Sequence, residues 1–310
     1  MTNWSNLVLA AILLASAFPS PARADEEWPR PDPTALPDSP HKDEVLYGAA
    51  LIRNTHALIG PSAEKPEMHY AGNSLDCSSC HLDAGRQRFG LSYIGVSNAY
   101  PRYMARENEA RNLTQRINGC LERSMNGRAL PENSREIKAM AAYINFLTEA
   151  APANLNGRGS PELPLPARAA DPERGREVYQ SFCVQCHGAN GEGLKNKGGG
   201  YAYPPLWGPD SFNTGAGMHR LITAARFIHA NMPFGATFET PSLTVEQAFD
   251  VAAFINAQPR PEKPGLDRDF PDRSKKPVDA PFPPFADNFP LSQHVLGPYQ
   301  PIIDARKKAE

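Results

Sequence analysis

The sequence predicts an all-α protein of two similar domains in tandem, joined by a proline-rich linker and followed by an extended proline-rich tail. Three observations predict this architecture. A CxxCH motif occurs twice, as Cys77–His81 and as Cys183–His187. Each copy stands between two segments whose apolar residues recur at helical spacing, and the two sets of segments resemble each other. A stretch rich in Ala, Pro and Gly separates the two sets.

The first 24 residues have the pattern of a signal peptide. One apolar run, Leu7–Phe18, is followed by small residues and by Ala22-Arg23-Ala24, an A-x-A cleavage pattern. The run is too short for a membrane-spanning helix, which needs about 20 apolar residues. No later apolar run is long enough either. We therefore expect a signal peptide at residues 1–24, cleavage near Ala24, and a periplasmic protein that does not span a membrane.

The charge balance argues against one class of partner. The chain has 32 Lys and Arg against 34 Asp and Glu, a formal net charge of −2. Proteins that bind nucleic acid usually carry a basic patch or stripe, so we expect no nucleic-acid partner.

Each domain is predicted to cross two helices, one before its motif and one after it. A glycine at the crossing lets the backbones approach, and an aromatic residue on the second helix fills the space beside it. The segments are Gly48-Ala-Ala-Leu-Ile and Gly175-Arg-Glu-Val-Tyr before the motifs, and Ala141-Ala-Tyr-Ile-Asn and Ala252-Ala-Phe-Ile-Asn after them. This order of elements resembles class I cytochrome c. We expect such domains at residues 25–150 and 171–260.

Proline shapes the two remaining segments. In the linker, residues 151–170, the run Pro161-Glu-Leu-Pro-Leu-Pro cannot be helical inside, because proline lacks a donor and restricts the residue before it. The composition of the tail, residues 261–310, permits disorder. Its spaced aromatic residues favour instead an extended strap packed across the domains; they are Phe270, Phe282, Phe285, Phe289 and Tyr299.

The cysteine pattern predicts two covalently bound haem c groups. Four of the five cysteines belong to the two motifs. A redox disulfide or half of a zinc site would not explain a histidine directly after both pairs, whereas haem attachment does. The two thiols of each motif bond to the porphyrin vinyl groups, and the histidine gives iron its proximal nitrogen. The predicted residues are Cys77, Cys80, His81, Cys183, Cys186 and His187.

The sixth ligand of each iron is expected in the loop before the last helix. Met232 stands 252 − 232 = 20 residues before Ala252 and is the candidate in the second domain, with Met218 as the weaker alternative. The same count from Ala141 leads back 141 − 120 = 21 residues to Cys120, the fifth cysteine. Cys120 is therefore the candidate in the first domain, where a buried thiol, or ligation by Met104 or Met125, is the alternative.

A Cys ligand indicates an enzyme rather than a simple carrier. A thiolate is anionic, stabilises ferric iron and lowers the reduction potential. A His/Cys site beside a His/Met site therefore predicts electron flow from the first haem to the second.

Basic residues surround Cys120 in the sequence. Arg116 and Arg123 stand four residues before it and three after it, and Ser124 adds a neutral donor. Charge runs are usually solvated faces, but here the guanidinium groups would suit a small oxyanion at the haem crevice. A sulfur oxyanion beside a sulfur ligand makes sulfur–sulfur chemistry plausible.

The segment from Arg116 to Gly127 resembles the catalytic-haem segment of the dihaem thiosulfate dehydrogenase family. The second-domain segments 203–213, 215–218 and 227–233 resemble the same family, and the likeness covers roughly residues 43–261. It implies that two thiosulfate ions are joined into tetrathionate with release of two electrons, and that the reaction is reversible in some members.

The resemblance also implies roles for individual residues. It implies that His81 and Cys120 are the ligands of the catalytic haem. It also implies that Arg116 and Ser124 bind the substrate, with Arg135 as a less close match. His187 and Met232 would hold the second haem, which passes electrons to a soluble or membrane-linked cytochrome c or a similar acceptor.

Two positions depart from the family pattern. Some members have Lys directly before the Met, and the two exchange as ligands with redox state; this chain has Asn231, so we expect steady His187/Met232 ligation. His229 stands three residues before Met232, where members often have Lys. It could compete for iron or only tune the pocket, and we interpret it as a pocket residue.

Two other functions remain open at this stage. A dihaem electron carrier would use Cys120 only to set a potential. A dihaem peroxidase needs an open or displaceable distal face, which neither the ligand placement nor the arginines suggest.

Overall fold

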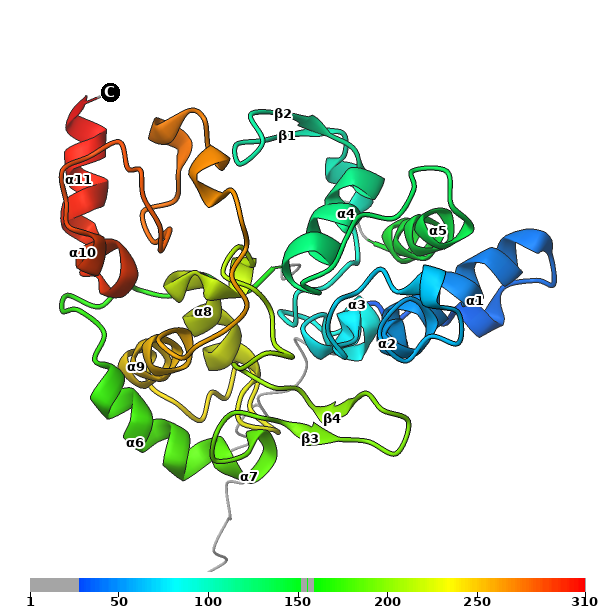
Figure 1. The fold of residues 1–310 in the computed structure, drawn as a ribbon, viewed down its shortest axis with the longest axis horizontal. Helices are drawn as coiled ribbons and strands as arrows, with labels where there is room; N and C mark the ends of the chain where they lie inside the picture. The colour runs from blue at the N-terminus through cyan, green and yellow to red at the C-terminus, as the bar shows by residue number, and fades with distance from the viewer. Residues whose placement is uncertain (1–27, 152–154, 156–158, 310) are drawn as a thin grey trace, which may run out of the picture.

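The computed structural model describes residues 28–151, 155 and 159–309. The predicted signal peptide and part of the predicted linker lie outside these residues. Figure 1 shows two mainly helical domains side by side, with the C-terminal tail against the second. Within the described part, no helix is long and apolar enough to cross a membrane.

The first domain is built on the crossing of two helices, α1 (Pro40–Arg53) and α5 (Arg135–Glu149). Each helix begins at a serine whose hydroxyl accepts a backbone N–H, Ser39 for α1 and Ser134 for α5. A Cβ added to Gly48 would lie 1.9 Å from the carbonyl oxygen of Ala139, so only glycine allows this crossing. Between the two helices lie α2 (Thr55–Leu58), α3 (Leu82–Gly85), β1 (Arg102–Met104), β2 (Glu109–Arg111) and α4 (Leu113–Arg123).

The second domain repeats the crossing with α6 (Pro172–Phe182) and α9 (Val245–Asn256). Pro172 occupies the first turn of α6 and Asp171 caps it, a favoured helix start. A Cβ on Gly175 would meet the Asp250 carbonyl oxygen at 2.0 Å. The other elements are α7 (Val184–His187), β3 (Leu194–Lys195), β4 (Tyr201–Tyr203) and α8 (Leu221–Asn231). The predicted helical crossing is therefore present in both domains.

The all-α prediction is correct for the main elements but misses two antiparallel pairs of very short strands. β1 pairs with β2, and β3 pairs with β4. Strands of two or three residues leave almost no alternating pattern in a sequence, so periodicity cannot reveal them. The remaining short segments are 3-10 turns at Pro33–Ala35, Pro66–Met68, Cys77–Ser79, Ser97–Ala99, Gly217–His219, Leu266–Arg268 and Arg273–Lys275.

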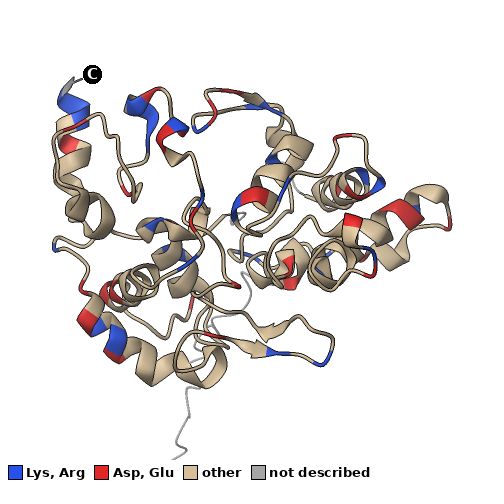
Figure 2. Cartoon of the chain, viewed as in Figure 1, with Lys and Arg blue, Asp and Glu red and all other residues tan. Residues whose placement is uncertain are grey.

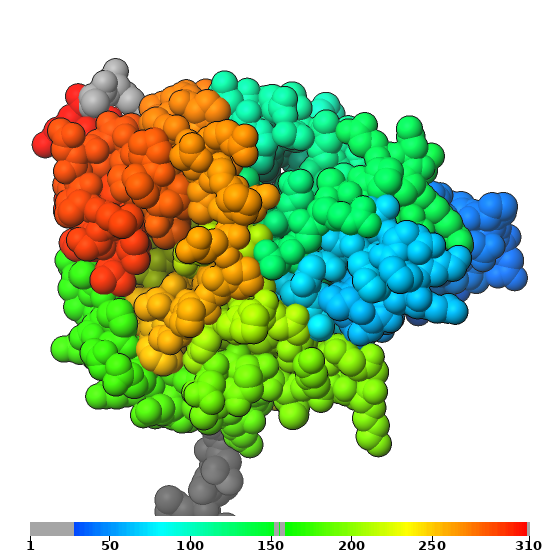
Figure 3. Space-filling view, viewed as in Figure 1, coloured from blue at the N-terminus to red at the C-terminus, as the bar shows by residue number. Residues whose placement is uncertain are grey.

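The tail contains two helices that the sequence analysis did not predict, α10 (Leu291–Leu296) and α11 (Gln300–Ala309). Tyr299 and Ile302 are 2% and 0% exposed and belong to the core of the second domain. Figure 3 shows the tail, coloured orange to red, covering one side of that domain and reaching the β1–β2 hairpin of the first. The tail is thus part of the packed structure.

The two domains meet through polar contacts. Asn73 donates to the carbonyl oxygen of Ser211 at 3.1 Å, and Arg88 pairs with Glu239 at 2.8 Å. Figure 2 shows acidic and basic residues interspersed over both domains. These contacts join the domain that carries the first CxxCH motif to the domain that carries the second.

Candidate haem and active site

The first CxxCH motif presents one ring nitrogen and two thiols. Nδ1 of His81 lies 2.6 Å from the carbonyl oxygen of Leu91, so donation there leaves Nε2 free as an acceptor. Burial lowers the pKa of His81 to about 4, which keeps the imidazole neutral. Cys77 and Cys80 form no disulfide. A neutral imidazole beside two unbridged thiols is the donor set that haem c needs.

The second motif has the same arrangement. Nδ1 of His187 lies 2.8 Å from the carbonyl oxygen of Pro204, which again leaves Nε2 free. Burial lowers the pKa of His187 and raises the pKa of Cys183 to about 11. Cys183 and Cys186 are likewise free thiols.

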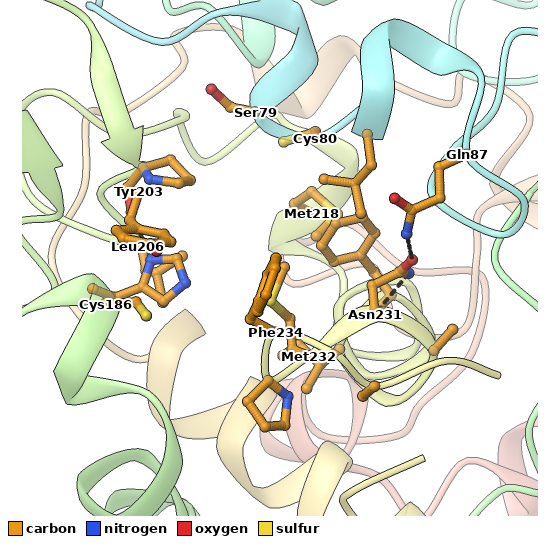
Figure 4. A pocket seen from close by; sticks show the side chains of 18 of the residues that line it. Ser79, Cys80, Gln87, Cys186, Tyr203, Leu206, Met218, Asn231, Met232 and Phe234 are labelled. Atoms are coloured by element: carbon orange, nitrogen blue, oxygen red, sulfur yellow. Dashed lines mark hydrogen bonds between the residues drawn. The ribbon is translucent and has the colours of Figure 1, made fainter. Parts of the chain in front are cut away.

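A cavity of about 750 Å³ lies beside the second motif. Cys183, Cys186 and His187 line it, and so do both candidate methionines, Met218 and Met232. Figure 4 shows Met232 across the cavity from Cys186, on the same side as Met218. The lining residues therefore fit a haem with His187 on one face and a methionine on the other.

The first motif borders the same cavity. Cys80 lines it together with Leu82 and Phe89, which all belong to the first domain. Two hydrogen bonds join the domains beside the cavity. The Gln87 side chain donates to the Asn231 side chain at 3.0 Å, and Asn231 donates to the Phe89 carbonyl oxygen at 3.2 Å. The cavity is thus lined by Cys183, Cys186 and His187 of the second motif, whereas Cys80 is the haem-binding residue of the first motif that reaches it.

Cys120 lies on α4, close to the first motif. Burial, and then the charge of Cys120, raise the pKa of Cys80 to about 11. Burial, and then the charges of Cys77 and Cys120, raise the pKa of Tyr93, whose ring stacks on His81 with 4.2 Å between centroids. Met125, one alternative ligand, is 3% exposed within the first-domain core, and Met104, the other, lies on β1.

Arg116 is the direct neighbour of the Cys120 sulfur. One helical turn separates the two residues, and Nη1 of Arg116 donates to Sγ of Cys120 at 2.8 Å. The charge of Cys120 is the main cause of the raised pKa of Arg116. Ser124 caps the end of α4, where its N–H donates to the Cys120 carbonyl oxygen at 2.8 Å. The Arg116 guanidinium therefore lies at the Cys120 sulfur, and Ser124 follows one turn after Cys120 at the end of α4.

Two other arginines of the sequence analysis point elsewhere. Arg123 forms a bidentate ion pair with Asp269 of the tail, at 2.8 and 2.7 Å. The guanidinium carbon of Arg135 lies 4.3 Å from the centre of the Tyr47 ring on α1. This contact ties Arg135 to α1 rather than to the Cys120 thiol.

Sequence reasoning missed Arg106, in the turn between β1 and β2. Burial, and then the charge of Arg123, lower the pKa of Arg106 to about 10. Its Nε is buried, and within the described residues it has no hydrogen-bond partner. The charge of Arg116 also acts on it. Nothing in the local sequence distinguishes Arg106 from its neighbours Arg102 and Arg111, because only the folded hairpin carries it to α4.

Family models agree with this two-domain reading. The SoxA/TsdA cytochrome c domain matches residues 67–152, and the subunit III domain of cbb3-type cytochrome c oxidase matches residues 170–255. Two cytochrome c domains, each with its own CxxCH motif, define a c-type cytochrome and imply two haem c groups.

Similar proteins narrow the class. The chain is 39% identical over 236 residues to the thiosulfate dehydrogenase of Thiomonas intermedia, covering 76% of this chain and 71% of the relative. It is 40% identical over 237 residues to that of Allochromatium vinosum, covering 74% and 83%. The chain belongs to the thiosulfate dehydrogenase family, as the resemblance in the sequence predicted.

A solved structure supports the fold. The as-isolated thiosulfate dehydrogenase (TsdBA) of Marichromatium purpuratum superposes with a TM-score of 0.69 at 40% identity. The match covers 76% of this chain, which spans 50% of that longer one.

Proposed function

We propose that this protein is a periplasmic dihaem oxidoreductase that joins two thiosulfate ions into tetrathionate and releases two electrons. The observation that carries the proposal is the 2.8 Å contact between the Arg116 guanidinium and the Cys120 sulfur. It puts a fixed positive charge beside a nucleophilic sulfur, which is the pairing that a sulfur oxyanion needs. Family membership supports the same reaction, since the relatives are thiosulfate dehydrogenases.

The two haem groups would be held by this chain's own residues. Cys77 and Cys80 would bond to the first haem, and His81 and Cys120 would hold its iron. When bound, the haems supply one-electron acceptors that carry two electrons from the first site to the second and on to a cytochrome c or similar acceptor. The residues at the second site would be Cys183, Cys186, His187 and Met232.

Cys120 provides the reacting sulfur. In the first step, the Cys120 thiolate and the sulfane sulfur of one thiosulfate form a sulfur–sulfur bond with loss of two electrons. In the second step, another thiosulfate attacks that sulfane sulfur, which breaks its bond to Cys120 and releases tetrathionate. The thiolate is regenerated, and the net change is two thiosulfate ions to one tetrathionate and two electrons. Run backwards with an electron supply, the same steps reduce tetrathionate.

Positive charge at the site answers a specific electrostatic difficulty. The second step brings a dianion against an adduct that carries a negative sulfonate, and like charges repel strongly where water is excluded. Arg116 and Arg106 offset this repulsion. Ser124 would donate a hydrogen bond to a substrate oxygen, and Arg135 would join only by leaving its contact with Tyr47.

One experiment separates the enzyme from a carrier. The purified oxidised holoprotein is mixed anaerobically with thiosulfate while the haem absorption bands are followed, and tetrathionate is assayed. Reduction with tetrathionate formation supports the proposal, and oxidation of the reduced protein by tetrathionate supports it in the reverse direction. If neither reaction occurs in protein that ascorbate does reduce, the protein is an electron carrier and the proposal is wrong.

A variant tests the role of Cys120. Cys120→Met should retain both covalent haems and lose turnover, because a thioether cannot form the sulfur–sulfur bond. Met104→Leu, which removes an alternative sulfur ligand of the same domain, is the matched control and should keep the spectrum and the rate. Full activity in Cys120→Met would remove this residue from the chemistry.

The periplasmic location has a separate test. The amino terminus of protein recovered from the periplasm should be Asp25, as cleavage after Ala24 requires. A cytoplasmic protein that retains residues 1–24 would contradict this part of the proposal.

A further inference from the structure

A carboxylate from the C-terminal tail lies among the arginines of the first domain. Asp269 accepts two hydrogen bonds from Arg123, at 2.8 and 2.7 Å, and its Oδ2 lies 3.8 Å from Nε of Arg106. The Asp269 residue is only 8% exposed. One buried carboxylate thus faces two guanidinium groups from two different elements, α4 and the β1–β2 turn.

The neighbours of Asp269 reinforce its position. The N–H of Phe270 donates to the carbonyl oxygen of Arg106 at 2.8 Å, and the Arg106 guanidinium lies over the Phe270 ring at 5.6 Å. Arg273 donates to the carbonyl oxygens of Asp269 and Phe270. Lys275 lies 4.6 Å from the centre of the Tyr103 ring on β1. The tail therefore packs against the β1–β2 hairpin, which carries Arg106.

We propose that Asp269 is a positioning residue of the anion site: through its ion pairs with Arg123 and Arg106 it keeps the guanidinium group of Arg106 beside α4, where a thiosulfate ion bound at Arg116 and Cys120 meets it. This inference rests on the proposed function. It gives the tail, which lies outside the segment that the family resemblance covers, a part in substrate binding.

Asp269 can hold Arg106 in place because it is a negative charge among three arginines, Arg106, Arg116 and Arg123. Arg116 and Arg123 stand 123 − 116 = 7 residues apart on α4, about two helical turns, so their side chains share the face of α4 that Arg106 approaches at Asp269. Asp269 is the countercharge that touches Arg123 and stands next to Arg106. Without that countercharge, the mutual repulsion of Arg106 and Arg123 favours rotation of either side chain into solvent. The site would then lose a preorganised donor for the oxyanion.

The test compares three variants of the holoprotein. Asp269→Asn removes the charge and keeps the shape, and Asp269→Glu restores the charge one methylene further out. Asp287→Asn is the matched control, because Asp287 is also a mostly buried tail carboxylate that pairs with an arginine, Arg306, but all its side-chain partners lie within the tail. Circular dichroism and the haem spectrum establish that each variant is folded and loaded.

Two readouts separate positioning from a general loss of structure. The first is a separate measurement of KM and kcat for thiosulfate oxidation. The second is equilibrium binding of thiosulfate to protein reduced with titanium(III) citrate, measured by calorimetry, since fully reduced protein cannot oxidise the ligand. Loss of one charge-assisted contact predicts a rise of about tenfold in both KM and Kd for Asp269→Asn, with kcat and both midpoint potentials unchanged.

Each result has a definite meaning. A raised KM and Kd in Asp269→Asn, smaller in Asp269→Glu and absent in Asp287→Asn, supports the inference. An unchanged or lowered KM in Asp269→Asn overturns the inference. A lowered KM would mean that the Asp269 carboxylate only repels the thiosulfate anion. If the Asn variant does not fold, Arg106→Gln takes its place, and an unchanged KM in that variant overturns the inference. Unaltered protein that neither binds nor oxidises thiosulfate overturns the proposed function as well.

Discussion

Replacing Arg116 by glutamine tests the central contact of the site. Glutamine retains a neutral donor on a shorter side chain but removes the positive charge that lies 2.8 Å from the Cys120 sulfur. The contact joins a guanidinium to a sulfur whose charge is the main cause of the raised pKa of Arg116. In the proposed reaction Arg116 is also the first cation that a bound oxyanion meets, so the substitution would act on both the nucleophile and the substrate.

The size of the effect follows from the type of contact. A hydrogen bond to a charged group contributes about 1.5–3 kcal/mol. Since 1.36 kcal/mol corresponds to a factor of ten in rate, kcat/KM for thiosulfate should fall roughly 10- to 150-fold. The covalent haem content should not change, because Arg116 makes no part of either CxxCH motif.

The assay is the initial rate of thiosulfate oxidation with ferricyanide as the electron acceptor, at fixed ionic strength. Arg128→Gln is the matched control: Arg128 belongs to the same basic run, but it stacks on Tyr70 and donates to the carbonyl oxygens of His69 and Glu67. A loss below threefold in Arg116→Gln, or an equal loss in Arg128→Gln, would refute the reasoning. The first result would mean that the contact is structural, and the second that any arginine of the run contributes through bulk charge.

Three further predictions concern stability, each measured by urea unfolding of the holoprotein. Gly48→Ala places a Cβ 1.9 Å from the Ala139 carbonyl oxygen and should lower the free energy of unfolding by about 3 kcal/mol; a loss below 1 kcal/mol would mean that the helices separate easily. Tyr299→Ala removes a tail ring that is 2% exposed in the second-domain core and should cost about 3–5 kcal/mol, whereas a tail that merely lies on the surface predicts no change. Burial, and then the charge of Arg260, lower the pKa of His219 from 6.5 to about 4. The unfolded chain therefore binds the proton first, and this residue should reduce the free energy of unfolding by up to about 1.4 kcal/mol per pH unit as the pH falls from 6.5 toward 4. His219→Gln should flatten that slope, and an unchanged slope would contradict the assignment.

Local spacing was sufficient to find much of the candidate site. The CxxCH motifs are covalent patterns that a sequence displays directly. The helix crossings were visible because Gly48 and Gly175 stand at matching places before them. Cys120 was found by counting back from the last helix, and the structure brings this residue to the first motif together with Arg116, its neighbour by one helical turn.

The remaining features depend on contacts between residues far apart in the chain. Arg123 was expected at the crevice because of its place beside Cys120, yet it pairs with Asp269, which lies 146 residues away. Arg106 carried no distinguishing signal, because only the β1–β2 turn and the tail place it near α4. The tail itself was expected to be extended, since its prolines mask the two short helices α10 and α11.

The sequence by itself indicated the class of chemistry, through two CxxCH motifs, a sulfur where a haem ligand is expected, and an arginine one turn away from it. These features lie within single helices and turns, where chain geometry fixes which residues meet. Only the tertiary structure decided which cations remain free to bind an anion, because an ion pair forms with whichever opposite charge the fold brings within reach. Arg123 meets the carboxylate of Asp269 in the tail, whereas the partner of Arg116 is the sulfur of Cys120.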